Sequence, residues 1–472
     1  MFTRRRIAVL AALMSLTACA TPAPDAGPRW TPCPSAPSPL DRMECAEVSV
    51  PLDHADPGGE KIEISVSRIP AADRANRLGS LVVIPGGPGG GRDLTVPFAL
   101  AHPRLVERYD WIAYDPRGVG ESEPITCRDE AGDAVARLNP PRTPADWAAA
   151  DTRITRFAEA CRAGAGRMAS LAGAANAARD LDVLRTALGD AKLNTVATSY
   201  GGQVAVTYAQ LFPASVGRMV LNSPGNPTKT HRQVLLDQAA GLERSLASLA
   251  DFCLTQDRCR LGTDRAAALR SIDELLRRLE SAPAGPLTRG LAELAITTAL
   301  PAPPTWPALL DGLGAALTGD GTMLAAQAEA LLAGAGNFLA ANSVINCTDT
   351  PDRHRLADVE TAAKEFAAVS PRFGVRVATR LLECSRWPPG TGRVAITGTP
   401  GVPPVLVLGN TGDPEAPLHS VTQVAGLLLS ARLLVNHADG HGAYGEGFGC
   451  VDAHTDRYLL DGTPPPSGTT CP

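Results

Sequence analysis

The stretch Ala197-Thr198-Ser199-Tyr200-Gly201-Gly202 joins a short apolar run, Asn194 to Ala197, to a helical pattern from Gln203 to Phe212. A serine between small residues at a strand-to-helix junction is typical of a sharp turn that presents a nucleophilic hydroxyl, because the two backbones approach closely there. Ala197 stands where this pattern usually has glycine, which adds one methyl group. The motif also occurs by chance, so a glycine-rich turn without chemistry is the alternative. We take Ser199 as the candidate nucleophile.

Short apolar runs alternate with helical patterns on both sides of this motif. This alternation predicts an α/β fold with a mostly parallel central sheet. One of the expected helices is Ala174 to Leu188, with apolar residues at helical spacing. The runs expected to form strands are Glu47 to Val50, Ile62 to Ile69, Leu81 to Ile84, Tyr109 to Tyr114, Asn194 to Ala197 and Met219 to Leu221.

The strand signal disappears after residue 225, and helical periodicity replaces it up to residue 389. Strand patterns return at Val405 to Leu408 and Leu433 to Val435. We therefore predict that residues 41–225 and 390–472 form one core and that residues 226–389 form a helical cap inserted into it. Clear helical patterns within the cap are Val234 to Phe252, Arg265 to Leu279 and Met323 to Leu332.

A glycine-rich loop, Pro85 to Gly91, follows the expected strand Leu81 to Ile84. In a fold of this kind, that position supplies a backbone N–H to the oxyanion that forms during acyl transfer, and glycine keeps side chains out of the way. The second N–H comes from the residue after the nucleophile. The candidate oxyanion donors are therefore Gly87 and Tyr200, with a flexible surface turn as the alternative for the loop.

An aspartate and a histidine follow the last two expected strands. Asp413 comes shortly after Val405 to Leu408, and His441, between two glycines, follows Leu433 to Val435. The order serine, aspartate, histidine is that of α/β-hydrolases, which predicts this fold. His441 would take the proton of Ser199, and Asp413 would hold the imidazole. This chemistry needs only water, so no cofactor is predicted, and the cysteine and histidine spacing does not match a zinc site.

Further motifs resemble, in order, the tripeptidyl aminopeptidase branch of the proline iminopeptidase-like α/β-hydrolases, which actinobacteria export. The resemblance runs from about Cys45 to Cys471 and implies an exported serine exopeptidase whose triad is Ser199, Asp413 and His441. The motifs are Val50-Pro51-Leu52-Asp53, Pro85 to Gly90, Asp115 to Gly120, Arg179 to Asp182, Ser199 to Gly202, Asn346 to Asp349, Cys384 with Trp387-Pro388, and Tyr458 to Pro464.

The chain departs from this family at three places. Ala416 stands where the family often has threonine, Asn222-Ser223 where it commonly has Asp-Gly, and Ala197 where it has glycine. None of these changes removes a catalytic group. They leave the substrate open, because similar relatives include tripeptide-releasing aminopeptidases, prolyl-type enzymes and esterase-like lipoproteins.

Residues 1–18 have the pattern of a secretory signal, with Arg4 to Arg6 before the apolar stretch Ile7 to Leu16. Leu16-Thr17-Ala18-Cys19 resembles the bacterial lipobox, which predicts a lipid anchor on Cys19. An ordinary signal cleaved elsewhere is the alternative, and Thr3-Arg4-Arg5 leaves the twin-arginine route open beside the general one. Residues 19–40, rich in Pro, Ala and Ser, are predicted to tether the protein to the outer face of the cytoplasmic membrane.

The sequence has 11 cysteines, which suggests disulfides in an exported protein. Ten remain when Cys19 is set aside, and proximity along the chain is our only guide to their pairing. The expected pairs are Cys33–Cys45, Cys127–Cys161, Cys253–Cys259, Cys347–Cys384 and Cys450–Cys471.

The composition excludes some classes of function. The formal net charge is -5, so nucleic acid is not an expected partner. No apolar run reaches about 18 residues, so membrane association is expected only through the lipid anchor. The leading hypothesis is an aminopeptidase whose Asp349 or Glu415 binds the substrate ammonium. The alternatives are a carboxylesterase for short acyl esters and, less favoured, a binding lipoprotein without catalysis.

Overall fold

The computed structural model describes residues 27–33, 42–92, 96–127, 132–257, 259–388 and 394–472. The predicted signal peptide and Cys19 lie outside these residues. Part of the predicted tether is described, and it is joined to the folded body. Thr31–Pro32 form strand β1, which pairs with β2, and a disulfide joins Cys33 to Cys45. The proline-rich composition gave no sign of the pairing of β1 with β2, whereas the Cys33–Cys45 disulfide was predicted.

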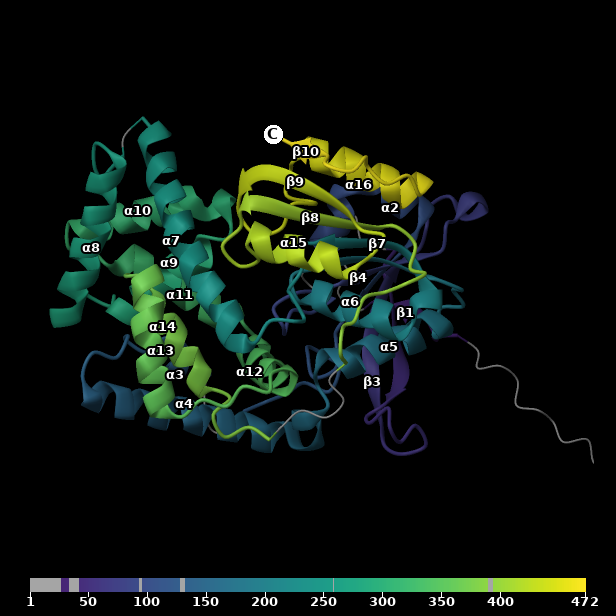
Figure 1. Ribbon diagram of the computed structural model, residues 1–472, viewed down its shortest axis with the longest axis horizontal. Coiled ribbons are helices and arrows are strands. Elements are labelled where there is room, and N and C mark those ends of the chain that lie inside the picture. The colour runs from purple at the N-terminus through teal and green to yellow at the C-terminus, as the bar shows by residue number, and fades with distance from the viewer. Residues whose placement is uncertain (1–26, 34–41, 93–95, 128–131, 258, 389–393) are drawn as a thin grey trace, which may run out of the picture.

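A ten-stranded sheet, ordered β1-β2-β3-β5-β4-β6-β7-β8-β9-β10, forms the centre of the molecule (Figure 1). The ladders β1–β2, β2–β3 and β3–β5 are antiparallel, and all the others are parallel. Eight of the strands were predicted from the sequence. The strands are β1 Thr31–Pro32, β2 Glu44–Pro51, β3 Lys61–Ile69, β4 Ser80–Ile84, β5 Asp110–Tyr114, β6 Leu193–Thr198, β7 Val216–Asn222, β8 Val405–Gly412, β9 Arg432–Asp439 and β10 Thr470–Cys471.

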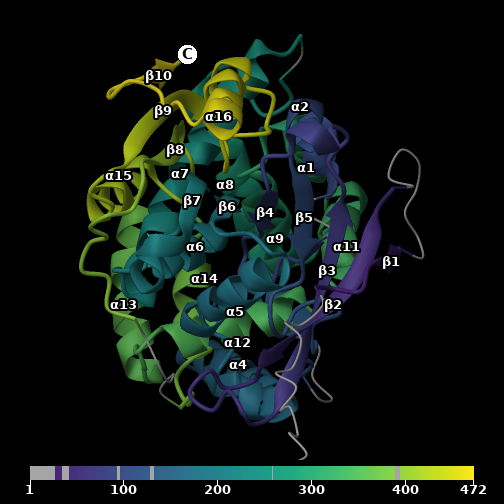
Figure 2. The ribbon, with the colours of Figure 1, turned by 90° about the vertical axis from the view of Figure 1, so that its right-hand side faces the viewer.

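Helices cover both faces of the sheet because its central strands are apolar on both sides. β4 and β5 are buried along their whole length. One face packs against α5 (Ala174–Ala187), α6 (Tyr200–Leu211) and α15 (Leu418–Leu427). The other face packs against α2 (Pro103–Arg108) and α16 (Gly449–Asp461), as Figure 2 shows from the side. The parallel strands end at one edge, where the catalytic candidates were expected.

The residues between β7 and β8 form a helical body at that edge, with a hydrophobic core of its own (Figure 1). Its helices are α7 His231–Thr255, α8 Arg265–Ser281, α9 Arg289–Ala299, α10 Trp306–Leu317, α11 Thr322–Gly334, α12 Phe338–Asp349, α13 Leu356–Val369 and α14 Gly374–Thr379. We call this body the cap.

Helix α4 (Pro144–Ala165) connects the cap to the sheet, although it precedes β6 in the chain. Its residues Ala150 and Ile154 belong to the core of the cap. Phe157 and Cys161, further along the same helix, belong to the core of the sheet. The amphipathic pattern of α4 therefore serves two separate cores. The remaining helices, α1 (Val96–Ala101) and α3 (Gly132–Ala136), lie in the loops after β4 and β5.

All five predicted disulfides are present, which fits a protein that matures outside the reducing cytoplasm. Among the described residues, no single helix has the length and apolar composition to cross a membrane. Helices α11 and α12 meet that criterion only as a pair, with a bend of 69° between them.

Candidate active site

Ser199 lies on the sharp turn between β6 and α6 that the sequence predicted. Its backbone angles are φ 57° and ψ -122°, a left-handed conformation that a non-glycine residue adopts only at a cost. The turn is tight because its neighbours approach closely. A Cβ on Gly201 would lie 2.4 Å from the Ile84 carbonyl oxygen, and one on Gly202 would lie 2.5 Å from Pro224 Cβ. Only glycine fits at these two positions, which explains the motif.

Asp413 and His441 are in direct contact. His441 Nδ1 lies 3.0 Å from both carboxylate oxygens of Asp413, whose side chain is fully buried. Asp413 Oδ1 also accepts hydrogen bonds from the backbone N–H groups of Glu415 and Ala416. These bonds hold the carboxylate in place facing the ring.

The carboxylates around His441 control its pKa. Burial lowers the pKa of the imidazole, but the charge and hydrogen bond of Asp413, helped by Glu415 and Glu446, outweigh burial and raise the pKa to about 9. With Nδ1 held by Asp413, the other ring nitrogen is free to act on the cavity that both His441 and Ser199 line. Within the described chain, no hydrogen bond joins Ser199 to His441. Such contacts often form only when substrate binds.

The loop that carries His441 is held by residues that we did not single out from the sequence. Asn222 Oδ1 accepts hydrogen bonds from the backbone N–H groups of Ala443 and Tyr444. Ser223 Oγ accepts one from Gly442 N–H. Asn222-Ser223 was noted only as a departure from a family pattern, and the structure shows that this pair anchors the histidine loop.

The cap also contacts this loop. His441 N–H donates a 2.7 Å hydrogen bond to the carbonyl of Pro301, which lies between α9 and α10. A Cβ on Gly440 would lie 2.6 Å from Pro303 Cδ, so this glycine permits the close approach of the cap. Nothing in the local sequence indicated that the cap touches the histidine backbone.

Both candidate oxyanion donors lie close to Ser199: Gly87 lines the same cavities, and Tyr200 is the next residue in the chain. A Cβ on Gly86 would lie 2.8 Å from Ser199 Cβ, so the glycine-rich loop runs directly beside the serine. Tyr200 is the first residue of α6, where a backbone N–H has no partner within the helix. Asp115 orders the far end of the loop by accepting a hydrogen bond from Arg92 N–H. The loop and the first turn of α6 thus meet where an oxyanion would form.

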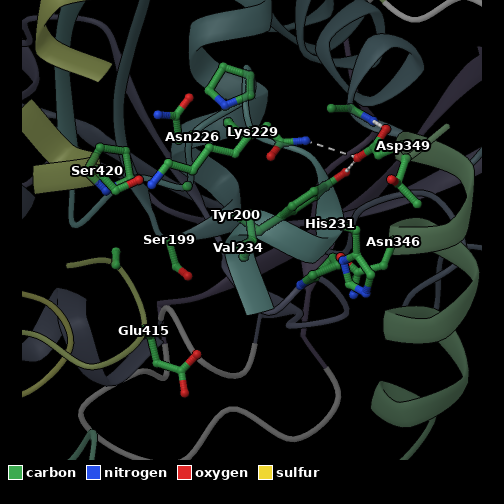
Figure 3. Close-up of a pocket in the computed structure, with 18 of the residues that line it drawn as sticks. Ser199, Tyr200, Asn226, Lys229, His231, Val234, Asn346, Asp349, Glu415 and Ser420 are labelled. Atoms are coloured by element: carbon green, nitrogen blue, oxygen red, sulfur yellow. Dashed lines mark hydrogen bonds between the residues drawn. The ribbon is translucent and has the colours of Figure 1, made fainter. Parts of the chain in front are cut away.

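Two cavities meet at Ser199. The larger has a volume of about 670 Å³ and extends into the cap between apolar side chains and His441. The smaller has a volume of about 140 Å³ and lies on the Tyr200 side, between α6 and α7 (Figure 3). Both cavities are lined by Gly87, Ser199, Gln238, Arg380 and Glu415. Substrate therefore has room on two sides of the serine.

The two predicted ammonium-binding acids have different surroundings. Asp349 accepts hydrogen bonds from Tyr200 OH, Gln203 Nε2 and Ala174 N–H, so both of its oxygens are engaged (Figure 3). Glu415 lines the space beside Ser199, and the one hydrogen bond that it accepts from the part of the chain described comes from the neutral amide of Gln238. The two acids therefore differ in hydrogen bonding: both oxygens of Asp349 are engaged, whereas Glu415 accepts its bond through Oε2.

A third acid, Glu383, was missed by the sequence reasoning. It lines the larger cavity and forms no ion pair within the described residues. Burial raises the pKa of both Glu383 and Glu415, and the positive charge of Arg380 opposes this effect. No sequence signal marked Glu383, because it lies in a helical segment whose place in the cavity depends on the folding of the cap. Among the described residues, no cluster of His, Cys, Asp and Glu fits a metal ion.

Comparisons with known proteins agree with this geometry. The family model described as "alpha/beta hydrolase fold" matches residues 79–448. The chain therefore belongs to the alpha/beta hydrolase family, and it is a serine hydrolase of that fold.

Three relatives with different names are similar to it along nearly the whole chain. "Serine protease Hip1" of Mycobacterium tuberculosis is 31% identical, over 94% of this chain and 90% of the relative. "Tripeptidyl aminopeptidase" of Streptomyces lividans is 32% identical, over 94% of this chain and 87% of the relative. "Carboxylesterase B" of M. tuberculosis is 31% identical, over 92% of this chain and 87% of the relative. The resemblance inferred from the motifs is confirmed, and the names leave peptide and ester substrates to be distinguished.

Proposed function

We propose that the protein is an exported aminopeptidase that releases short peptides, tripeptides among them, from free N-termini. The observation that carries this proposal is the pair of acids Glu383 and Glu415 in the cavity that Ser199 and His441 line. Neither acid forms an ion pair among the described residues, so a substrate ammonium would find a carboxylate there that is not already engaged in a salt bridge. A relative named tripeptidyl aminopeptidase supports the peptide length.

The proposed mechanism assigns one step to each member of the triad. His441 takes the proton of Ser199 as the hydroxyl attacks the scissile carbonyl, and Asp413 stabilises the imidazolium that results. The N–H groups of Gly87 and Tyr200 bind the oxyanion. The imidazolium then gives its proton to the leaving amine, and the amide bond breaks to leave an acyl-enzyme on Ser199. Water, activated by His441, releases the peptide.

The surroundings of the acids support recognition of an ammonium. Burial raises the pKa values of Glu383 and Glu415, so desolvation makes each carboxylate costly in the empty cavity. A bound ammonium favours the ionised form and recovers part of that cost. An acetylated N-terminus brings no charge and leaves the carboxylates buried and unpaired.

The test compares tripeptidyl anilides with free and with acetylated N-termini. We expect cleavage of the free-amine substrate only, with loss of activity in Ser199→Ala. Glu383→Gln and Glu415→Gln should each raise KM for the free amine, while Glu274→Gln, an exposed cap variant, should not. Equal cleavage of the acetylated substrate would remove the basis of the aminopeptidase proposal.

A carboxylesterase is the second candidate, and one feature favours it. The larger cavity is lined mainly by apolar side chains, such as Val135, Leu242 and Phe338, which suit an acyl chain. A relative named carboxylesterase B supports this alternative. Fast turnover of short acyl esters by a protein that cleaves no free-amine peptide would establish it.

For location, we propose export by the signal at residues 1–18 and a lipid anchor on Cys19 at the outer face of the cytoplasmic membrane. The five disulfides support export. Mass spectrometry of the mature N-terminus tests the anchor. A diacylated Cys19 is expected, and Cys19→Ala should release the protein from the membrane fraction. Cleavage at another site with an unmodified cysteine would contradict the anchor.

A further inference from the structure

The function proposed above assigns no part of the substrate to the smaller cavity beside Ser199. Figure 3 shows it with Tyr200 reaching from beside Ser199 toward Asp349, with Lys229 near Ser420 and His231 near Asn346. Its lining is more polar than that of the larger cavity, which extends into the cap. A substrate cleaved at Ser199 has an acyl part and a leaving part, and the two cavities offer one space for each.

Most charges that line the smaller cavity are already compensated. Lys229 is paired with Asp237. The carboxylate of Asp349 accepts three hydrogen bonds from polar neighbours. His231 is neutral at neutral pH, because burial and the positive charge of Arg380 lower its pKa to about 3. None of these groups needs a charged ligand.

Arg380 differs from them. It follows α14, and its guanidinium lines both cavities at their junction. Among the described residues no carboxylate lies within ion-pair distance of it, and its one hydrogen bond is a long one, 3.5 Å from Nη2 to Asn342 Oδ1. A guanidinium carries five N–H donors in a planar fork that matches a carboxylate. The junction of the cavities thus holds a partly buried cation with unused donors.

We propose that the smaller cavity binds the leaving part of the substrate and that Arg380 binds its terminal carboxylate. The substrates are then short peptides with both termini free, and long polypeptides are disfavoured. The ammonium faces Glu383 or Glu415, and the carboxylate faces Arg380. This inference rests on the proposed aminopeptidase function and narrows its substrate class.

The chemical step is that of the proposed mechanism. The bond from the acyl carbon to the leaving nitrogen breaks, and the bond from that carbon to Ser199 Oγ forms. The serine proton passes through His441 to the leaving nitrogen. The released fragment is an amino acid or short peptide that keeps its carboxylate. Arg380 holds this group and positions the new amine.

The proposal competes with a simpler role for Arg380. Its charge lowers the pKa values of Glu383 and Glu415 against the effect of burial, and in this alternative the arginine serves only to keep those acids ionised. The two roles differ in one respect. A neutralising role affects every free-amine substrate equally, whereas a carboxylate receptor distinguishes substrates by their C-terminal group.

The experiment measures kcat/KM of the mature enzyme for tetra-alanine and for tetra-alanine amide, which differ only at the C-terminus. We expect the free carboxylate to be preferred by about 10- to 100-fold, the range for a hydrogen-bonded charged group. Arg380→Gln should abolish the preference, and Arg380→Lys should retain part of it. Arg386→Gln, an exposed arginine six positions further along, is the matched control and should change neither value.

Each outcome decides the matter. Equal cleavage of both substrates by the wild-type enzyme overturns the carboxylate site and leaves the aminopeptidase intact, and this result needs no variant. If Arg380→Gln loses the same activity on both substrates, the arginine serves to keep Glu383 and Glu415 ionised. This result also overturns the carboxylate site. If the wild-type enzyme cleaves neither peptide but cleaves an acyl ester, the proposed aminopeptidase function fails and the inference falls with it.

Discussion

The raised pKa of His441 predicts an unusual pH dependence for the reactivity of Ser199. The base must be neutral to take the serine proton, and its pKa is about 9 against an ordinary value of 6.5. The difference between these two pKa values corresponds to about 3 kcal/mol in favour of the imidazolium, and at pH 7 only about 1% of His441 is neutral. Reactivity should rise about tenfold per pH unit from pH 6 to pH 8 and reach its plateau above pH 9.

The assay is the rate of covalent labelling of Ser199 by a fluorophosphonate as a function of pH. This probe avoids peptide substrates, whose α-amino groups titrate near pH 8 and would distort the curve. Glu446→Gln removes one of the carboxylates that raise the pKa, so its midpoint should fall while the plateau rate is kept. Ser199→Ala should give no labelling.

A midpoint at or below 6.5 would refute the reasoning, because it would mean that the carboxylates around His441 do not control its protonation. An unchanged midpoint in Glu446→Gln together with a wild-type value near 9 would assign the raised pKa to Asp413 and Glu415.

Three further predictions concern the packing around the site. Gly201→Ala places a Cβ 2.4 Å from a carbonyl oxygen of β4 and should destabilise the protein by about 1–3 kcal/mol in urea unfolding, whereas Gly449→Ala, which meets nothing, should not. Asn222→Ala leaves two N–H groups of the histidine loop without their acceptor, and kcat should fall with KM little changed in steady-state kinetics. Arg117→Ala leaves the buried carboxylate of Asp180 without its bidentate partner and should cost about 3–5 kcal/mol of stability by calorimetry.

The parts of the fold that the sequence predicted share one physical origin. Eight strands were marked by continuous or alternating apolar runs, because a buried strand must be apolar on at least one face. The two strands that were missed, Thr31–Pro32 and Thr470–Cys471, have two residues each and are too short to show a pattern. The sequence also did not show that α4 packs against both the sheet and the cap, because both contacts use one continuous apolar pattern.

The residues of the site also fall into a group that the sequence predicted and a group that it did not. Ser199, Asp413 and His441 follow strand ends in the expected order, so local motifs were enough to find them. Their supporting residues come from distant segments. Glu383 reaches the cavity only when α14 packs against α7 and α13, and no spacing in the sequence encodes that contact.

The contact between Pro301 and His441 links a catalytic residue found from a local motif to a distant segment of the cap. Leu300, next to Pro301, accepts hydrogen bonds through its carbonyl from Ser245 Oγ and Trp306 Nε1, so this cap segment is fixed to α7 and α10. The same segment receives the N–H of His441. The cap therefore supplies part of the frame that holds the catalytic base as well as the wall that selects substrate. For this reason, exchanging the cap between relatives would alter the position of His441 together with specificity, and the two effects would have to be measured separately.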